Sequence, residues 1–378
     1  MTVYINGVAQ PPSIEIAVTW FGDYSGDLNP RATVLFPWSS PAKLANPAAL
    51  PAEYGRGAAW SPNGEFLAIA HTGDPFVTIY KRSGVTFTKL ANPATPPASV
   101  GRAAAWSPNG EFLAIGHSSD PRVTIYQRSG ITFTKLADPA ELPPGTGNGV
   151  AWSPNGEFLA VAHSTNPYVT IYQRSGTTFT KLANPAALPA GAGNAVAWSP
   201  NGEFLVIAHT TDPYVTIYQR SGITFTKLAD PAAKPTGTGY NAAWSPNGEF
   251  LAIAHLTDPA VTIYQRSVIT FTKLADPANL PAGIGYGVAW SPNGEFLIVA
   301  HSSNPYVTIY QRLGITFTKL ANPATLPGGI GKDPVWSPNG EFLAVAHGTT
   351  PFVTIYQTSR KPAESGMALV KGVLREGD

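Results

Sequence analysis

The chain has 378 residues, of which only 12 % are charged, and its formal net charge is +1. A basic stripe of the kind that binds nucleic acid is therefore not expected. Cysteine is absent, which excludes a disulfide framework and thiolate metal sites. No apolar run is long enough to span a bilayer as a helix, and residues 1–7 lack the basic and apolar regions of a secretory signal.

Residues 1–33 do not share the pattern of the rest of the chain, and we expect them to form an N-terminal arm. Ile14, Ile16, Val18 and Trp20 alternate with smaller or more polar residues, which predicts a half-buried strand followed by a turn-rich loop over residues 21–27. Two alternatives remain open. The arm folds against the flank of its own domain, or it is an attachment strand that completes a sheet in a neighbouring subunit.

Residues 34–357 consist of one unit repeated seven times without a single insertion. A tryptophan marks each unit, and successive tryptophans are 46 residues apart. They are Trp60, Trp106, Trp152, Trp198, Trp244, Trp290 and Trp336. A fixed period of this size indicates a repeat architecture, in which neighbouring units bury the apolar faces that one unit cannot bury alone.

Each unit predicts four strands and no helix. In the unit of Trp152 we expect strands over residues 150–153, 158–163, 168–173 and 178–182. Asn-Gly, at Asn155 and Gly156, predicts a hairpin turn between the first two strands, because both residues tolerate positive φ. Four short antiparallel strands in a unit of this length are typical of a propeller blade.

The two ends of the repeat region predict a closed ring. The last unit stops after its third strand at residues 353–357 and lacks the Thr-Phe-Thr-Lys-Leu segment of the other six. Residues 43–45 carry the end of that segment, so we expect residues 34–45 to supply the outer strand of the seventh blade and remove the open edge. The predicted fold is an all-β, seven-bladed β-propeller of four-stranded antiparallel blades, closed by an N-terminal outer strand. Residues 358–378 form a C-terminal tail, with a candidate docking segment at residues 367–370.

Val-Ala-Trp-Ser-Pro-Asn-Gly-Glu-Phe-Leu, followed by Asp-Pro-Tyr-Val-Thr-Ile-Tyr as at Asp212 to Tyr218, resembles a blade of the WD-repeat family. The resemblance covers roughly residues 34–357 and implies a protein-interaction propeller. Two departures stand out: no Gly-His dipeptide precedes the first strand, and Tyr-Gln or Tyr-Lys replaces the Trp-Asp pair that closes the third. The near-identical blades are also similar to those of structural proteins of tailed bacteriophages, which implies a place in the virion. The WD-repeat resemblance implies the cytoplasm as the alternative location.

The repeated polar residues favour structural roles. All seven histidines stand eleven residues after a tryptophan, and we expect each to bond a neighbouring hydroxyl, turn carboxylate or backbone group. They are His71, His117, His163, His209, His255, His301 and His347. Equivalent atoms in successive blades are too far apart to share an ion at ~2.1 Å, so no metal or other cofactor is expected.

The repeated glutamates and arginines of the hairpin turns are expected to form exposed ion pairs. Identical acids spread around a rim do not converge on one bond, so no catalytic residue is predicted and an enzyme is not expected.

Positions that vary among the blades are the candidate ligand-binding residues, since the ring geometry does not dictate them. The first set stands four residues before each tryptophan, beside the predicted channel mouth: Arg56, Arg102, Asn148, Asn194, Tyr240, Tyr286 and Lys332. The second set follows the turn between the second and third strands: Phe76, Arg122, Tyr168, Tyr214, Tyr306 and Phe352, with Ala260 in the fifth unit. Chain direction places both sets on one face. An aromatic and hydrogen-bonding set suits a glycan or a protein loop. The alternative is neutral drift in exposed loops.

Three classes of function remain open. The first is a non-enzymatic structural or adhesion protein of a phage particle, attached to other virion proteins through the arm and displaying the propeller to a host-surface glycan or protein. The second is a lectin-like glycan-binding propeller that uses the aromatic positions. The third is an intracellular WD-repeat scaffold for protein interactions.

Overall fold

The computed structural model describes residues 4–5, 8–9, 16–19, 31–34 and 40–358. The chain divides into two compact units, one formed by Met1–Ser40 with Ala363–Asp378 and the other by Pro41–Pro362. The described residues contain strands and no helix.

The described residues of the first unit form two antiparallel strand pairs. Strand β1 (Tyr4–Ile5) pairs with β2 (Val8–Ala9), and β3 (Ile16–Thr19) pairs with β4 (Arg31–Val34). The strand predicted around Ile16 and Val18 is therefore present. The loop predicted over residues 21–27 and the docking segment predicted at 367–370 lie outside the described residues.

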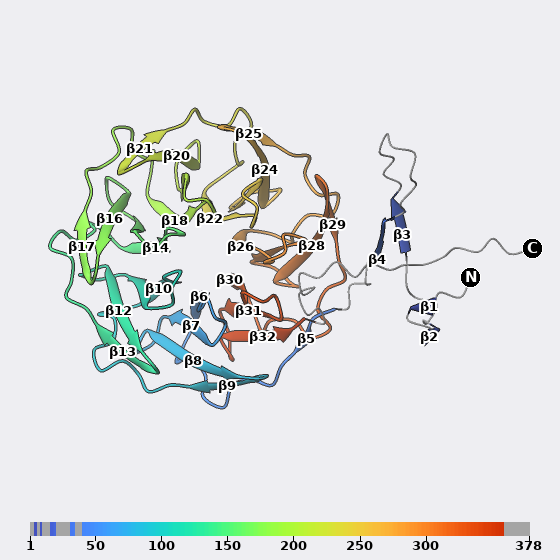
Figure 1. Ribbon diagram of the computed structural model, residues 1–378, viewed down its shortest axis with the longest axis horizontal. Helices are drawn as coiled ribbons and strands as arrows, with labels where there is room; N and C mark the ends of the chain where they lie inside the picture. Colours follow the sequence, from blue (N-terminus) through green and yellow to red (C-terminus); the bar gives the residue numbers. More distant parts are fainter. Residues whose placement is uncertain (1–3, 6–7, 10–15, 20–30, 35–39, 359–378) are drawn as a thin grey trace, which may run out of the picture. The chain divides into compact units, whose positions relative to one another are not determined.

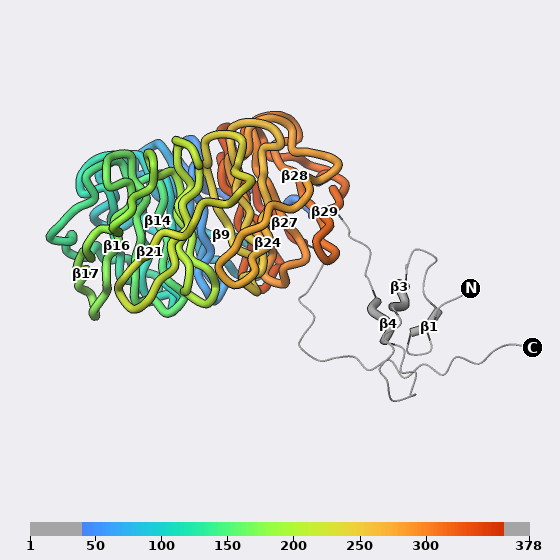
Figure 2. Tube along the Cα trace, turned by 90° about the horizontal axis from the view of Figure 1, so that it is seen from above, coloured from blue at the N-terminus to red at the C-terminus, as the bar shows by residue number. Residues whose placement is uncertain are grey.

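The second unit is a ring of seven blades, each a four-stranded antiparallel sheet, as predicted (Figure 1). In the first six blades the strands follow chain order from the axis outward, and in the seventh β5 takes the outer place. The innermost strands of neighbouring blades contact one another. In the side view of Figure 2 the strands run between the two faces of the ring.

Each blade has strands of nearly constant length. The innermost strands are β6 (Gly55–Trp60), β10 (Gly101–Trp106), β14 (Gly147–Trp152), β18 (Gly193–Trp198), β22 (Gly239–Trp244), β26 (Gly285–Trp290) and β30 (Gly331–Trp336). The second strands are β7 (Phe66–His71), β11 (Phe112–His117), β15 (Phe158–His163), β19 (Phe204–His209), β23 (Phe250–His255), β27 (Phe296–His301) and β31 (Phe342–His347). The third strands are β8 (Val77–Ser83), β12 (Val123–Ser129), β16 (Val169–Ser175), β20 (Val215–Ser221), β24 (Val261–Ser267), β28 (Val307–Leu313) and β32 (Val353–Gln357). The outer strands are β9 (Thr86–Lys89), β13 (Thr132–Lys135), β17 (Thr178–Lys181), β21 (Thr224–Lys227), β25 (Thr270–Lys273), β29 (Thr316–Lys319) and β5 (Ala42–Lys43).

The N-terminal strand β5 closes the ring, which confirms the prediction from the incomplete last unit. Lys43 is paired with Tyr356 and Ala42 with Gln357 in β32. The next residue, Leu44, donates its backbone N–H to the carbonyl of Ile355 at 2.8 Å and packs against the core between the seventh and first blades. The closing strand was predicted over residues 34–45, but Val34 lies in β4 and residues 35–39 lie outside the described residues.

The hairpin between the first two strands of each blade is built by side chains as well as by a glycine. Positive φ was predicted for both residues of the Asn-Gly turn. Gly156 adopts a φ of 69°, as predicted, but Asn155 does not take positive φ, so that part of the prediction is wrong. Asn155 acts through its side chain: Oδ1 accepts hydrogen bonds from Ser153 Oγ at 2.6 Å and from the backbone N–H of Glu157 at 3.1 Å. Ser153 Oγ in turn accepts from the N–H of Phe158 at 2.8 Å. The same bonds recur in the other blades, which explains the unvarying Ser-Pro-Asn-Gly-Glu-Phe string.

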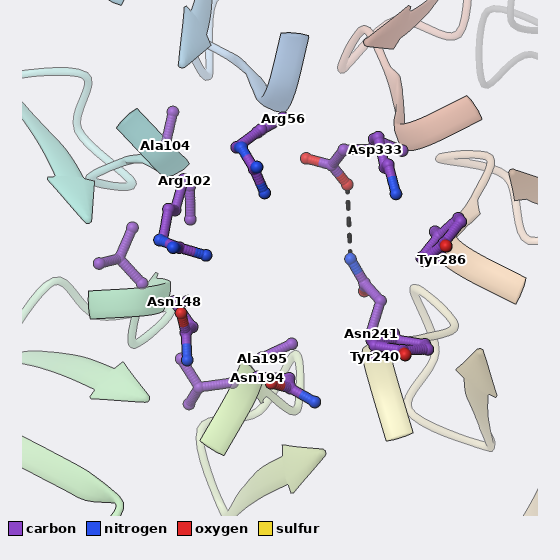
Figure 3. A pocket seen from close by; sticks show the side chains of 15 residues that line it. Arg56, Arg102, Ala104, Asn148, Asn194, Ala195, Tyr240, Asn241, Tyr286 and Asp333 are labelled. Carbon is purple, nitrogen blue, oxygen red and sulfur yellow. Dashed lines mark hydrogen bonds between the residues drawn. The ribbon is translucent and has the colours of Figure 1, made fainter. Parts of the chain in front are cut away.

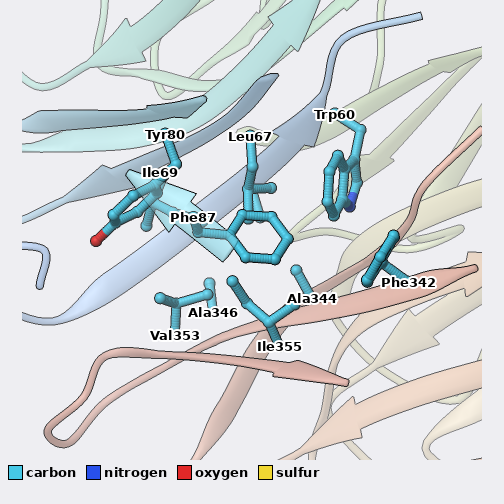
Figure 4. Close-up of a cluster of buried hydrophobic side chains, with 11 residues drawn as sticks. Trp60, Leu67, Ile69, Tyr80, Phe87, Phe342, Ala344, Ala346, Val353 and Ile355 are labelled. Carbon is cyan, nitrogen blue, oxygen red and sulfur yellow. The ribbon is translucent and has the colours of Figure 1, made fainter. Parts of the chain in front are cut away.

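Neighbouring blades are joined by one aromatic contact that is repeated around the ring. Phe158 of the third blade stacks on Trp198 of the fourth, with ring centroids 6.0 Å apart, and meets the edge of Phe225 at 6.2 Å. The guanidinium of Arg220 lies 5.2 Å from the centre of the Phe158 ring. Between the seventh and first blades the corresponding cluster brings Phe342 against Trp60 and Phe87 (Figure 4).

In the fourth blade, the exposed Glu–Arg ion pair that was expected at the turns does not form. Arg220 Nε donates to the carbonyl of Gly202 at 2.8 Å and Nη1 to that of Gly222 at 2.9 Å, while the guanidinium covers a phenyl ring. Glu203 accepts instead from Gln219 Nε2 at 2.9 Å. The arginine is therefore part of the blade interface, where it packs on an aromatic ring and satisfies two carbonyl groups.

Each histidine is buried and bonds a hydroxyl group, as expected for a structural role. His163 Nε2 lies 3.0 Å from Thr170 Oγ1 within the third blade, and the other six histidines make the equivalent contact. Burial lowers the pKa of His163 to about 4, although backbone hydrogen bonds oppose the shift. The same shift is found for all seven rings. The folded ring therefore holds its histidines neutral at and above pH 6.5.

We predict that the ring loses stability steeply as the pH falls below 6.5. The histidine pKa values are lower in the folded chain than the ~6.5 of an unfolded one, so unfolding takes up protons between about pH 6.5 and 4. Each histidine then costs about 3 kcal/mol over that interval. Urea unfolding followed at pH 7 and pH 5 measures the effect. His163→Gln, which keeps a group able to bond Thr170, should lower the proton uptake by one. Equal stability at both pH values would contradict the prediction.

We predict that Val268→Gly stabilises the ring by about 1 kcal/mol. Val268 has a φ of 54° at a hairpin where five other blades place a glycine, and a β-branched residue is strained there. The reverse change in the third blade, Gly176→Val, is the matched control and should destabilise by a similar amount. An added Cβ at Gly176 meets no atom within 4 Å, so the control reports the backbone alone. Chemical unfolding of both variants measures the pair, and two changes of the same sign would contradict it.

We predict that removing residues 1–45 lowers the free energy of unfolding by about 2 kcal/mol or more, whereas removing residues 1–40 does not. The longer deletion exposes the edge of β32 and takes away the Leu44 contact, and the shorter one leaves both in place. Tryptophan fluorescence during urea unfolding compares the two chains. If they unfold at the same denaturant concentration, β5 does not lock the ring.

Candidate functional site

A cavity of about 360 Å³ lies at the axis of the ring and is lined by residues of the innermost strands. Residues from all seven blades form its wall, and their side chains converge on one central space (Figure 3). The lining includes every member of the first variable set: Arg56, Arg102, Asn148, Asn194, Tyr240, Tyr286 and Lys332. The structure thus brings this set together, and its role in binding stays a prediction.

Each residue of this set occupies a β-bulge. In the third blade Gly147 is paired with His163 and Gly149 with Ala162, so Asn148 is the extra residue between two consecutive pairs. The same register shift occurs at the equivalent place in the other six blades. A bulge residue is released from the regular alternation of the strand, and its side chain can be directed elsewhere. Here it is directed into the cavity, half-buried in a strand rather than exposed in a loop.

Three consecutive blades contribute the cations of the cavity. Lys332 Nζ of the seventh blade lies 3.1 Å from the centre of the Tyr286 ring. Arg56 of the first blade lies over Tyr54 at 5.4 Å, and Arg102 Nε of the second donates to Ser118 Oγ at 2.8 Å. Desolvation, and then the charge of Arg56, lowers the pKa of Lys332 to about 8. The same two causes, in the same order, lower the pKa of Arg102.

The remaining blades contribute amides and phenols. Asn148 Nδ2 donates to the carbonyl of Gly193 at 2.9 Å, and Asn194 Nδ2 donates to that of Gly239 at 2.8 Å. Each amide therefore reaches the innermost strand of the next blade. Tyr240 and Tyr286 lie side by side with ring centroids 5.2 Å apart. The wall of the cavity is thus cationic on one arc and aromatic or amide-bearing on the other.

Two further lining residues, Asn241 and Asp333, were missed in the sequence. They stand one position after the first set, where the other blades have glycine or alanine. The small residues are needed because the next blade is close: a Cβ added at Gly57 would lie 2.8 Å from the Cα of Ala103. The sequence did contain a signal for both residues. At this position two of the seven blades carry a polar residue and the other five carry glycine or alanine, and variation of the same kind identified the first set.

Asp333 is held by two hydrogen bonds. Its Oδ2 accepts from the backbone N–H of Ala58 at 2.9 Å, and its Oδ1 accepts from Asn241 Nδ2 at 3.4 Å, a contact that crosses the cavity (Figure 3). The side chain keeps some contact with the channel space but lies deep in the wall, and this burial raises its pKa to about 7. Its hydrogen bonds oppose that shift.

The second variable set does not line the cavity. Its members have left-handed backbones, with φ values between 65° and 69°. In the third blade Tyr168 donates its N–H to the carbonyl of Thr165 at 2.8 Å, and its own carbonyl accepts from the N–H of His163 at 2.9 Å. That carbonyl also faces the next blade, since a Cβ added at Gly193 would lie 2.5 Å from it. The set therefore lies at the end of the blade where the innermost strands begin, as chain direction predicted. The geometry shows a backbone role, and ligand binding by these side chains stays a prediction.

Two further findings concern the described part of the chain. No group of three or more His, Asp or Glu side chains is placed there to hold a metal ion. Within the same residues, no helix has the length and apolar character needed to cross a membrane.

The fold and the site define a class: a closed seven-bladed β-propeller with a polar cavity on its axis. The sequence model described as "Eukaryotic translation initiation factor eIF2A" matches residues 98–228 and again residues 187–315. The two matches overlap along the repeat and together span more than half of the chain, so the chain belongs to this family. No curated protein matches the sequence.

Comparison with solved structures supports the fold alone. Hydrazine synthase of Kuenenia stuttgartiensis is similar, with a TM-score of 0.64 and 18 % sequence identity over 83 % of this chain and 97 % of the other. At this identity the likeness carries no information on activity. The family match and the fold support a WD-like propeller suited to protein interactions. They give no support to the resemblance to phage structural proteins.

Proposed function

We propose that this protein is a non-catalytic interaction propeller that binds a segment of a partner protein at the axial cavity. The observation that carries the proposal is the placement of the seven bulge residues. They are among the positions at which the nearly uniform blades differ, and all seven converge on one cavity. The alternative explanation of this variation was neutral drift in exposed loops. It does not apply to these residues, because they are half-buried and lie at a bulge within a strand.

The composition of the cavity supports a peptide segment as the occupant. Two tyrosines in contact provide an apolar surface with polar edges, and amide and cationic groups around them can fix the orientation of a backbone or side chain. Its volume of about 360 Å³ is near the lower end for binding pockets and suits one or two side chains of a loop. The family match to a translation initiation factor supports a role in macromolecular assembly rather than catalysis.

The absence of catalysis is part of the proposal. Asp333 is the one acidic residue in the wall of this cavity, and both of its oxygens accept hydrogen bonds from the ring. General acid–base chemistry of the paired-carboxylate kind needs a second acid facing the first across the substrate. The repeated glutamates of the turns, such as Glu203, are bonded to their own blades instead.

A virion role and glycan binding, both expected from the sequence, have no support in the comparisons and stay predictions. Attachment through residues 1–33 also stays a prediction. We propose a cellular protein-interaction role, in the cytoplasm, because the family match favours the WD-like alternative.

Selection from a random peptide library on the immobilised propeller tests the proposed function. We expect enriched peptides whose affinity falls about tenfold in Tyr240→Ala and Tyr286→Ala, because each substitution removes an aromatic contact. The matched control is Ile223→Ser, a change to an exposed side chain in the β20–β21 hairpin at the other end of the blade, which should leave affinity unchanged.

Two results would overturn the proposal. One is a selection without enrichment by the wild-type ring. The other is a set of peptides that is indifferent to both tyrosine substitutions. Binding to a glycan array that depends on Tyr240 and Tyr286, with no peptide enriched, would favour the lectin alternative instead.

A further inference from the structure

The three cations of the axial cavity come from neighbouring blades. Lys332 lies on β30, Arg56 on β6 and Arg102 on β10, and these strands are consecutive around the ring. All three side chains line the same cavity. Figure 3 shows Arg56 and Arg102 side by side, with their guanidinium groups turned towards the central space. The rest of the chain has almost balanced charges, so this arc is a local concentration of positive charge.

None of the three cations has a carboxylate partner among the described residues. The ion pairs of that part of the chain join other side chains, such as Lys135 with Asp138. Arg56 lies over Tyr54, and its buried Nε has no hydrogen-bond partner within the described chain. Lys332 lies over Tyr286, a contact that leaves ammonium hydrogens for an acceptor.

Holding these cations together in one cavity is unfavourable for the protein by itself. Desolvation, and then the charge of Arg56, lowers the pKa of both Lys332 and Arg102. Like charges in a partly desolvated site repel one another, and an anion placed between them removes that cost. Charge-assisted hydrogen bonds from arginine to a carboxylate would add directional contacts.

Asp333 does not supply the missing negative charge. Its two oxygens are engaged by Ala58 and Asn241, and its burial raises its pKa to about 7. Burial therefore favours the neutral, protonated form of this carboxyl group more than water does. No basic side chain of the described residues lies within ion-pair distance of Asp333, so the three cations do not pair with it.

We propose that the arc formed by Lys332, Arg56 and Arg102 binds the side-chain carboxylate of an aspartate or glutamate in the partner segment, an inference that rests on the proposed function. The opposite arc, with Tyr240, Asn148 and Asn194, contacts the residues next to that acid. The cavity thus selects acidic peptide segments from among all segments that would fit its size.

An array of capped hexapeptide pairs, identical except for one Glu or Gln, tests this inference. Among pairs that bind, we expect the Glu member to bind about tenfold more tightly, and its affinity to fall with added salt. Lys332→Met and Arg56→Gln should each abolish most of this preference, whereas Lys332→Arg should keep it. Removing a repelling charge should leave the melting temperature unchanged or raise it, which shows that the ring is intact.

The matched control is Lys234→Met. Lys234 lies at the same end of the blades but outside the cavity and outside both variable sets, and it pairs with Asp212 at 2.9 Å. Its loss changes the net charge by the same amount as Lys332→Met, so the preference for Glu should survive. A preference that is lost in Lys234→Met and kept in Lys332→Met would show general attraction to the face and overturn the inference.

The remaining outcomes separate this inference from the proposed function. Pairs that bind equally well, with affinity still dependent on Tyr240 and Tyr286, overturn the carboxylate site and leave the interaction propeller standing. An array with no binder of either kind overturns both. Inorganic phosphate that binds the ring while no Glu peptide does would show a free-anion site and overturn the peptide inference.

Discussion

The structure depends on one contact that each blade makes with the next. A phenylalanine from the second strand of one blade stacks on the tryptophan of the following blade and is covered by that blade's arginine, as at Phe158, Trp198 and Arg220. A single four-stranded sheet has two apolar faces and cannot bury either alone. The contact therefore makes every blade dependent on two neighbours, and it is satisfied throughout only when the circle is complete. The seventh blade completes it with a strand borrowed from the other end of the repeat region.

The same constraint explains where the chain is free to vary. The innermost strands of neighbouring blades approach one another so closely that five of the seven positions directly after the bulge carry glycine or alanine, as the approach of Gly57 to Ala103 shows. The bulge one residue earlier relaxes this restriction, because its side chain leaves the plane of the sheet and enters the axial cavity. The residue that lines the cavity and the residue that packs against the next blade are thus adjacent in each innermost strand, as Arg56 and Gly57 are. Seven different side chains can be presented without a change in the ring.

Much of the fold was predictable because the repeat supplies seven copies of the same information. The blade, the number of blades, the role of β5 and the structural histidines follow from spacing and from the missing segment of the last unit. The errors arose where a side chain had two physically reasonable partners. Arg220 was predicted to pair with a glutamate, but it packs on Phe158. In this position its guanidinium covers an aromatic ring and donates hydrogen bonds to two carbonyl groups, which is more contact than an exposed ion pair would give. Asn155 was given a backbone role and instead bonds through its side chain.

The sequence by itself determined the all-β class, the seven-fold repeat, the closure by the N-terminal strand and the seven positions that now surround the axis. These properties are encoded locally or by periodicity, which a single chain displays directly. Only the tertiary structure decided that the first variable set converges while the second holds its backbone against the next blade. Only it revealed Asp333 and Asn241 as partners across the cavity, and showed three cations that have no carboxylate partner among the described residues. Such relations join residues from blades that are distant in the chain, and they depend on the radius and curvature of the ring, which no local pattern records.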